Sequence, residues 1–193
     1  MKQCQRFGIL GDLIISFSRL LNKEATHKPS GQHVLDEDYY KRIDAIQFTM
    51  SHDDGKKTND LEKSDIILLG VSRTSKTPTS IYLANRGFKT ANIALIPSIG
   101  IPQPIIEKPN LSCVIGLLIE PNRLAEVRKN RMMSFNESKS SYYTNLESIV
   151  KEVEESKNIF KKYKWPVIDV TRKSIEEIAT SIIKILEIKK KND

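Results

Sequence analysis

The chain has 193 residues, of which 39% are hydrophobic and 28% charged, and its 31 basic residues outnumber its 24 acidic ones. This length suits one α/β domain with a single core rather than two independent domains. The net charge of +7 suits anionic ligands such as nucleotides but is too diffuse to indicate a nucleic-acid partner. No apolar run approaches the ~20 residues of a membrane helix, so we expect no membrane partner. Two cysteines without metal-ligand spacing, Cys4 and Cys113, are typical of a cytoplasmic protein.

Residues 1–60 predict a helical amino-terminal part of this single domain. Apolar residues at helical spacing favour a first helix with one buried face: Leu10, Leu13, Ile14, Phe17, Leu20 and Leu21. Residues 25–33 predict a loop because they are polar and contain proline and glycine. A second amphipathic helix is expected over residues 35–51, with a buried face made of Tyr39, Ile43, Ile46 and Met50.

Residues 61–193 alternate between short apolar runs and helical patterns. The runs predict buried strands at 65–70, 91–97, 113–119 and 165–170. Helices are expected over 80–88 with Gly87 as the C-cap, over 122–133 after Pro121, from a capping box at Thr144 and Glu147, and from a second box at Ser174 and Glu177. This order predicts an α/β fold with a mostly parallel sheet flanked by helices and a ligand at the carboxyl ends of the strands.

The segment GVSRTSKTPTS, residues 70–80, resembles a phosphate-binding loop. Such loops read G-x-x-x-x-G-K-[ST], where glycines let backbone amides close around phosphate, lysine reaches the outer phosphates and a hydroxyl helps hold Mg²⁺. Gly70, Lys76 and Thr77 are present, whereas Ser75 stands in the place of the second glycine and Pro78 follows.

A strand that leads into this turn and then into a helix is the context in which such a loop binds phosphate. We therefore predict that the loop binds a nucleotide, with Lys76 also acting in catalysis and Thr77 as the Mg²⁺ ligand. The predicted nucleotide-binding residues are Gly70, Val71, Ser72, Arg73, Thr74, Ser75, Lys76 and Thr77. The alternative is an ordinary strand-to-helix turn.

Longer stretches resemble the pyruvate phosphate dikinase regulatory protein family, which includes the regulators of phosphoenolpyruvate synthase. The resemblance is carried, in order, by HVLDEDYYKRIDAIQFTMSHDDG, GVSRTSKTPTSIYLANRGFKTANIALIP, GLLIEPNRLAEVRKNRM and WPVIDVTRKSIEEIA. It covers nearly the whole chain and includes a loop that ends in Lys-Thr-Pro. Proteins of that family carry an additional portion before the stretch that aligns with CQRFGILGDLI. We therefore expect this chain to bind ADP but to transfer phosphate more slowly than an extended form.

The resemblance implies a cytoplasmic regulatory serine/threonine kinase with a phosphate-binding-loop fold and a second, pyrophosphorylase activity. Members of the family use ADP to phosphorylate a threonine of pyruvate phosphate dikinase or phosphoenolpyruvate synthase, which inactivates that enzyme. They reverse this with inorganic phosphate, which releases pyrophosphate. The implied ligands are ADP, inorganic phosphate and Mg²⁺. The sequence leaves open which enzyme is the partner and whether the chain forms a homodimer.

The segment HDDG, residues 52–55, is the candidate acid-base group. We expect Asp53 or Asp54 to accept the threonine proton or to hold Mg²⁺, and His52 to act as acid or base in the phosphate-driven direction. The sequence does not decide which aspartate is the base. The alternative is an Asp-Gly turn that only ends a helix.

Other charged residues have weaker functional signals. Arg73 lies in the loop, while Arg123, Arg128 and Arg131 could contact phosphate or an acidic partner, although a solvated helix face is the commoner outcome. Asp169 is expected to cap the turn TRKS. Two other functions remain open at this point: a phosphate-loop kinase of small molecules, and a nucleotide-binding remnant without turnover.

Overall fold

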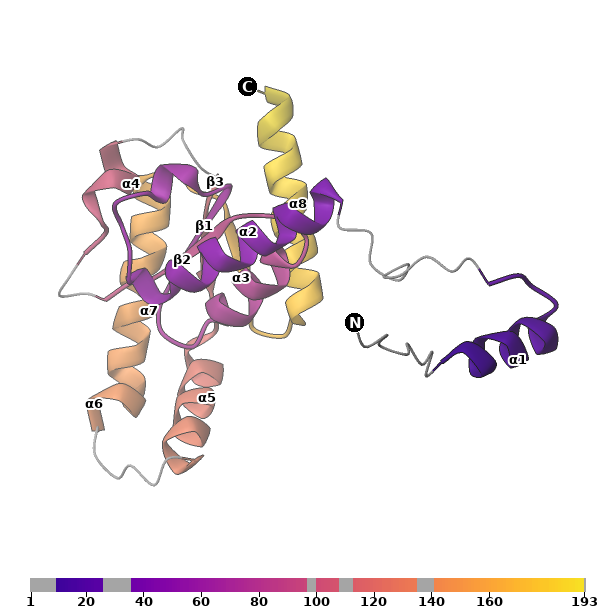
Figure 1. The fold of residues 1–193 in the computed structure, drawn as a ribbon. Coiled ribbons are helices and arrows are strands. Elements are labelled where there is room, and N and C mark those ends of the chain that lie inside the picture. Colours follow the sequence, from indigo (N-terminus) through magenta and orange to yellow (C-terminus); the bar gives the residue numbers. More distant parts are fainter. Residues whose placement is uncertain (1–9, 26–35, 97–99, 108–112, 135–140, 193) are drawn as a thin grey trace, which may run out of the picture. The chain divides into compact units, whose positions relative to one another are not determined.

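The structure is a computed structural model that describes residues 10–25, 36–96, 100–107, 113–134 and 141–192 (Figure 1). It divides the chain into two compact units, Met1–Asp36 and Glu37–Asp193. Residues 26–33 of the predicted first loop lie outside the described residues. No described helix combines the length and the apolar character that crossing a membrane requires.

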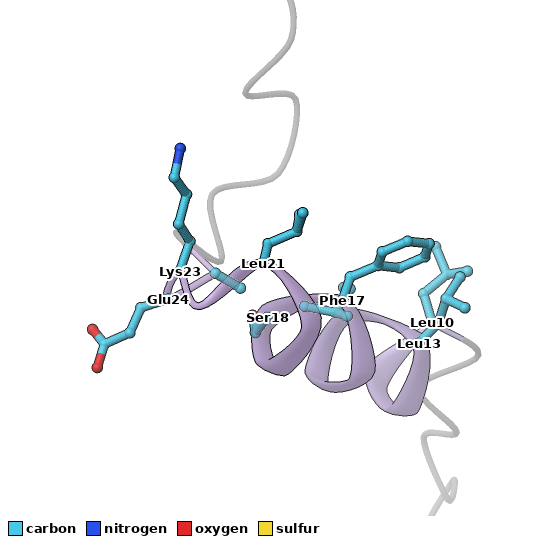
Figure 2. Close-up of a pocket in the computed structure, with 9 residues that line it drawn as sticks. Leu10, Leu13, Phe17, Ser18, Leu21, Lys23 and Glu24 are labelled. Carbon is cyan, nitrogen blue, oxygen red and sulfur yellow. The ribbon is translucent and has the colours of Figure 1, made fainter.

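The described part of the first unit contains the helix α1, Gly11–Leu21, as predicted. It ends at Asn22, whose φ of 51° lies in the left-handed region. The expected buried face is wrong for this unit, because no α1 residue is buried. Figure 2 shows Leu10, Leu13 and Phe17 beside one another along a hollow of about 270 Å³.

The second unit is built on a parallel sheet, which confirms the predicted α/β class (Figure 1). Its strands are β1 (Ile66–Gly70), β2 (Thr90–Ala94), β3 (Cys113–Leu118) and β4 (Val167–Asp169), in the order β2-β1-β3-β4. In the two pairings of β1, Ile66 lies opposite Thr90 of β2 on one side and Cys113 of β3 on the other. Three strands fall within the apolar runs predicted from the sequence, and β2 begins one residue before its predicted run. The carboxyl ends of the four parallel strands meet at one edge.

The β1 strand is buried on both faces because its successive side chains alternate between two apolar clusters. Ile66 and Leu68 pack in the cluster that includes Ile178 and Ile182 of the carboxyl-terminal helix. Ile67 and Leu69 belong to the second cluster, which includes Phe160. A Cβ at Gly116 of β3 would stand 2.6 Å from the Phe160 ring, so only glycine fits there.

Helical segments connect and cover the strands. They are α2 (Glu37–Ser51), η1 (Asp53–Gly55), η2 (Leu61–Lys63), α3 (Lys76–Ala84), α4 (Gln103–Glu107), α5 (Pro121–Ser134), α6 (Ser141–Thr144), α7 (Leu146–Lys162) and α8 (Ile175–Asn192). The α3 helix starts at Lys76, earlier than the predicted Ser80. The predicted C-cap at Gly87 is wrong, because the C-cap is Asn85 and the chain turns at Gly87 two residues later, where φ is +87°. Pro121 opens α5 as expected.

The buried face of α2 differs from the predicted one. Ala45 and Thr49 are buried, whereas Ile43 is exposed and Met50 keeps 65% of its surface accessible. The Thr49 hydroxyl accepts a hydrogen bond from the amide of Thr90, the first residue of β2. The fully buried residues of α2 are therefore small, while the predicted Tyr39 and Ile46 are only half-buried.

Only one of the two predicted capping boxes is present. At the start of α8, the Ser174 amide donates to Glu177 and the Glu177 amide donates to the Ser174 hydroxyl, over 2.8 and 3.2 Å. At α7 the predicted box at Thr144 and Glu147 is wrong, because Asn145 is the N-cap and accepts from the Ser148 amide.

Candidate functional site

A cavity of about 690 Å³ lies at the carboxyl ends of β1 and β2. It is bordered by the loop between β1 and α3, by the residues after β2, and by side chains from α5, α6 and α7. Its lining residues are Asp54, Ser72, Arg73, Ser75, Lys76, Thr77, Pro78, Ala94, Leu95, Ile96, Val127, Arg128, Tyr143 and Glu152. This is where parallel α/β sheets bind ligands.

The predicted phosphate loop leaves β1 at Gly70 and enters α3 at Lys76. Gly70 has no room for a side chain, because a Cβ there would lie 2.8 Å from both the Leu117 carbonyl and the Thr74 hydroxyl. The Thr74 hydroxyl in turn donates to the Val71 carbonyl over 3.0 Å. These contacts fold the loop tightly against β3. Ser72, Arg73, Ser75, Lys76 and Thr77 line the cavity.

Left-handed backbone is concentrated around this cavity. Five described residues other than glycine have positive φ, and three of them line it: Asp54 (51°), Arg73 (74°) and Ser75 (60°). Such conformations cost of order 1–3 kcal/mol for a residue with a Cβ and cluster at ligand-binding sites. Ser75 therefore has a left-handed backbone, a conformation that favours glycine. Glycine is also the residue that phosphate-binding loops usually carry at this position.

The start of α3 is suited to an anion. Ser75 is the N-cap residue but makes no side-chain cap hydrogen bond. The first amides of a helix have no partner within the helix and carry the positive end of its dipole. Ser75, Lys76 and Thr77 belong to the cavity lining, so these amides lie where phosphate oxygens can accept from them.

Lys76 is the central cation of the site and keeps only 5% of its surface accessible. Its ammonium group donates to the carbonyls of Gly70 and Val71 over 3.0 and 2.9 Å. Burial lowers its pKa to about 8, and the charges of Arg128 and Arg73 add to that effect, whereas Asp54 and Asp53 oppose it. A bound anion would restore the charged form, so the lysine is poised for a phosphate ligand.

The acidic cluster, defined as Asp53, Asp54, Thr77 and Asn92, lies beside the loop. The Asp53 carboxylate accepts from the Thr77 hydroxyl over 3.0 Å and from the Asn92 amide group. The Asn92 carbonyl oxygen accepts from the Asp54 amide over 2.9 Å. Thus the structure brings together the aspartates and the hydroxyl that were predicted from separate segments, and Asp54 lines the cavity.

Asn92 was not singled out in the sequence. It is fully buried in β2, and its backbone amide donates to the His52 carbonyl over 3.2 Å. The available signal was a polar residue within the apolar run ANIALIP, since a buried amide needs partners. Here those partners are the backbone and side chains of the HDDG segment.

His52 lies behind the acidic cluster rather than in the cavity lining. It is buried and stacked on Phe48, with ring centroids 3.9 Å apart. Its Nε2 lies 2.7 Å from the Asp60 carboxylate and its Nδ1 lies 2.8 Å from the Phe48 carbonyl. The hydrogen bond from His52 keeps the pKa of Asp60 below its usual value. In this arrangement His52 supports the segment that carries Asp53 and Asp54.

The arginine cluster, defined as Arg128, Glu152, Tyr143 and Ser72, also borders the cavity. Arg128 is buried, although a solvated helix face was the commoner expectation for its segment. Its guanidinium donates to Glu152 over 2.6 Å and lies over the Tyr143 ring at 4.4 Å. The nearby Arg123 pairs instead with Glu126 on the exposed surface of α5.

Asp169 has the capping role expected for it. Its carboxylate accepts from the amide and the hydroxyl of Thr171 over 2.9 and 2.5 Å, and these hydrogen bonds lower its pKa. The described residues contain no group of three or more histidine, cysteine, aspartate or glutamate side chains placed to hold a metal ion. A metal at the cavity would therefore need ligands such as the Thr77 hydroxyl and the phosphates of a substrate.

Comparison with known proteins adds family information to this geometry. The family model described as kinase/pyrophosphorylase matches residues 1–183. A protein of Pelagibacter ubique is 60% identical over 191 residues, covering 99% of this chain and 70% of its own length. Proteins of Rhizorhabdus wittichii and Bradyrhizobium diazoefficiens are 44% and 45% identical, and 69% and 66% of their lengths are covered. All three carry the name of a pyruvate, phosphate dikinase regulatory protein. The chain thus spans about two thirds of the length of these relatives.

Proposed function

Since the chain belongs to the kinase/pyrophosphorylase family, we propose that it is a phosphotransferase that regulates pyruvate phosphate dikinase. ADP is the phosphoryl donor and a threonine of the dikinase is the acceptor. Inorganic phosphate drives the removal of the phosphate from that threonine. The names of the relatives favour the dikinase over phosphoenolpyruvate synthase as the target.

Both reactions transfer one phosphoryl group between oxygens. In the first, the threonine oxygen attacks the β-phosphorus of ADP, the bond to the bridging oxygen breaks, AMP leaves and the hydroxyl proton goes to a base. In the second, an oxygen of inorganic phosphate attacks the phosphothreonine, its bond to the threonine oxygen breaks, and pyrophosphate leaves while threonine regains a proton. Catalysis of such transfers relies mainly on positioning and on stabilisation of charge.

The observation that carries the proposal is the meeting of Lys76, Thr77 and the two aspartates at one cavity. The loop amides and Lys76 would hold the diphosphate, with the lysine next to the phosphoryl group that moves. The low exposure of Lys76 strengthens its interaction with an anion because less water screens the charge.

Magnesium fits the oxygen ligands of the acidic cluster. The Thr77 hydroxyl lies 3.0 Å from Asp53 Oδ1, so both oxygens are near one position next to the loop. Magnesium in phosphoryl-transfer sites takes one or two protein oxygens and completes its shell with water and substrate phosphates. When bound, it would neutralise charge on the phosphates. Thr77 and Asp53 would hold it, and Asn92 would keep the Asp53 carboxylate in place.

Asp54 is the proposed base for the threonine hydroxyl. Asp54 is among the residues that line the cavity, whereas Asp53 is not, and Oδ1 of Asp53 accepts from Thr77 and Asn92. The left-handed backbone at Asp54, together with the hydrogen bond from its amide to Asn92, fixes where this side chain leaves the loop. His52 would then act indirectly, by supporting the loop through Asp60 and Phe48.

The test is incubation of this chain with Mg²⁺, the dikinase and ADP labelled at the β-phosphate. The proposal expects label on a threonine of the dikinase and its release as pyrophosphate when inorganic phosphate is added. Label transferred from ATP to a metabolite would instead indicate a small-molecule kinase. Binding of ADP without any transfer, also with an extended form of the protein, would indicate a nucleotide-binding protein without turnover.

A further inference from the structure

Arg128 is a buried charge at the edge of the cavity. It is 1% exposed, yet it is among the residues that line the hollow next to the phosphate loop. A buried guanidinium is costly unless its donors are satisfied and its charge is balanced. Its contacts therefore show how the charge is balanced within the chain.

Most of these contacts connect separate elements. Nη2 donates to Glu152 Oε2 over 2.6 Å and Nη1 lies 3.3 Å from Oε1, so the α7 carboxylate clamps the guanidinium at two points. Weaker hydrogen bonds reach the Tyr143 carbonyl over 3.2 Å and the Ser72 carbonyl over 3.4 Å. Arg128 thereby joins α5 to α6, to α7 and to the phosphate loop.

One donor of Arg128 is left over. Its Nε has no hydrogen-bond partner within the described part of the chain, although it is shielded from solvent. A pair that served only to brace α5 against α7 would not require an unused donor on a residue that lines the cavity. The hydrogen bond from Arg128 to the Ser72 carbonyl is also long, and it is weaker than a hydrogen bond to an anionic ligand would be.

Arg128 also acts on the loop lysine. Its charge is one of those that lower the pKa of Lys76, so the two cations repel each other electrostatically at the same cavity. Two phosphate groups that meet for transfer bring several negative charges together, and a single lysine cannot balance them. The cavity is therefore lined by two cations of the loop, Arg73 and Lys76, and by Arg128, whose charge is balanced by Glu152.

We propose that Arg128 binds a second phosphate group next to the one held by Lys76, and that Glu152 is the carboxylate which this phosphate displaces from the guanidinium. This inference rests on the proposed function, because it assigns a residue to inorganic phosphate in the phosphate-driven reaction. The phosphate of AMP or ADP has the same chemistry and is the other source that the experiment distinguishes.

The experiment measures the affinity of inorganic phosphate by calorimetry for the wild-type chain and for Glu152→Gln. The glutamine keeps the size and one acceptor but no longer competes as a charge, so phosphate should bind about tenfold more tightly. Glu155→Gln is the matched control, since it removes the same charge from an exposed position on the same helix. It should alter the affinity less than twofold, as expected for a screened surface charge.

Arg128→Lys provides a second variant that keeps the charge but loses the fork of donors. It should weaken phosphate binding, and it keeps the inference testable if Glu152→Gln does not fold. Equal affinities in Glu152→Gln and Glu155→Gln, or unchanged phosphate binding in Arg128→Lys, would show that the pair only braces α5 and α7.

Parallel titrations with AMP and ADP identify the source of the phosphate. Tighter binding of inorganic phosphate alone assigns Arg128 to the phosphate co-substrate, and tighter binding of AMP and ADP as well assigns it to a nucleotide phosphate. The proposed function is tested separately by ADP binding to the wild-type chain. If ADP binds normally while Glu152→Gln changes no phosphate affinity, only the assignment of Arg128 fails.

Discussion

The acidic cluster and the arginine cluster border the same cavity but balance their charges in opposite ways. In the acidic cluster, the Asp53 carboxylate accepts from a hydroxyl and an amide, which are uncharged donors. In the arginine cluster, Arg128 is clamped by a carboxylate. Uncharged donors orient Asp53 without cancelling its charge, so that side of the site is ready for a cation. The arginine must exchange one anion for another, so its side is ready for a phosphate.

The largest expected effect follows from removing the proposed base, Asp54, from the acidic cluster. Asp54→Asn keeps the size of the side chain but removes its ability to accept a proton, and transfer of label from ADP should fall by ~10² or more. ADP affinity should change little, because Asp54 is assigned to the acceptor threonine. Asp53→Asn serves as the comparison and should raise the Mg²⁺ concentration needed for activity. If both variants transfer label at the wild-type rate, the HDDG segment is only a turn.

A second prediction concerns Lys76, which belongs to neither cluster. Lys76→Ala removes a charge-assisted contact to the diphosphate worth about 1.5–3 kcal/mol, so ADP should bind roughly tenfold more weakly or worse. Calorimetry measures this directly, and circular dichroism checks that the chain is folded. Unchanged ADP affinity would place the phosphate site elsewhere and would remove the basis of the comparison.

The third prediction concerns the residue that aligns the acidic cluster. Asn92→Ala leaves the Asp54 amide without its side-chain partner and frees the Asp53 carboxylate to move. Transfer should fall about tenfold, or ~1.4 kcal/mol, within the range for a lost buried hydrogen-bond partner. ADP affinity should stay nearly constant, which a merely destabilised protein would not show. Asn85→Ala is the control, because that amide only donates to the Ile81 carbonyl on an exposed helix end.

The smallest effect is a pH dependence of ADP binding. Lys76 has a pKa of about 8, so its charged fraction falls as the pH rises from 7 to 9. Because the diphosphate binds the charged form, affinity should fall by up to about tenfold over this range, with uptake of a proton on binding. Calorimetry in buffers of different ionisation enthalpy measures that uptake. Lys76→Arg should bind ADP with no such uptake, and an equal uptake in this variant would exclude Lys76 as its source.

Local sequence patterns were sufficient to predict where the strands lie and where the loop between β1 and α3 begins. DIILLG and CVIGLLI are apolar runs that can only be buried, and Gly70 ends the first where the chain must turn tightly. The box at Ser174 and Glu177 is likewise a local pattern that forms as expected. These features depend on neighbours within a few residues, so they can be predicted without knowledge of the fold.

The contacts between residues on different sides of the cavity could not be predicted from such local patterns. Arg128 and Glu152 are 24 residues apart, and Asn92 is 39 residues from Asp53. Nothing in the spacing of the residues on α5 shows that one arginine is buried while Arg123 remains exposed. That difference arises from how α5 and α7 pack in three dimensions. The buried face of α2 also depends on packing between distant segments, because Thr49 contacts the first residue of β2.

The central claim is that one cavity serves both directions of phosphoryl transfer. The most direct test is to measure, for Lys76→Ala and the wild-type chain, the rate of ADP-driven phosphorylation and the rate of phosphate-driven release of pyrophosphate with the same dikinase. A shared cavity predicts that both rates fall together, by about tenfold or more when ligands are below saturation. Loss of the ADP-driven reaction with an unchanged rate of pyrophosphate release would contradict the claim and would require a second site for inorganic phosphate and phosphothreonine.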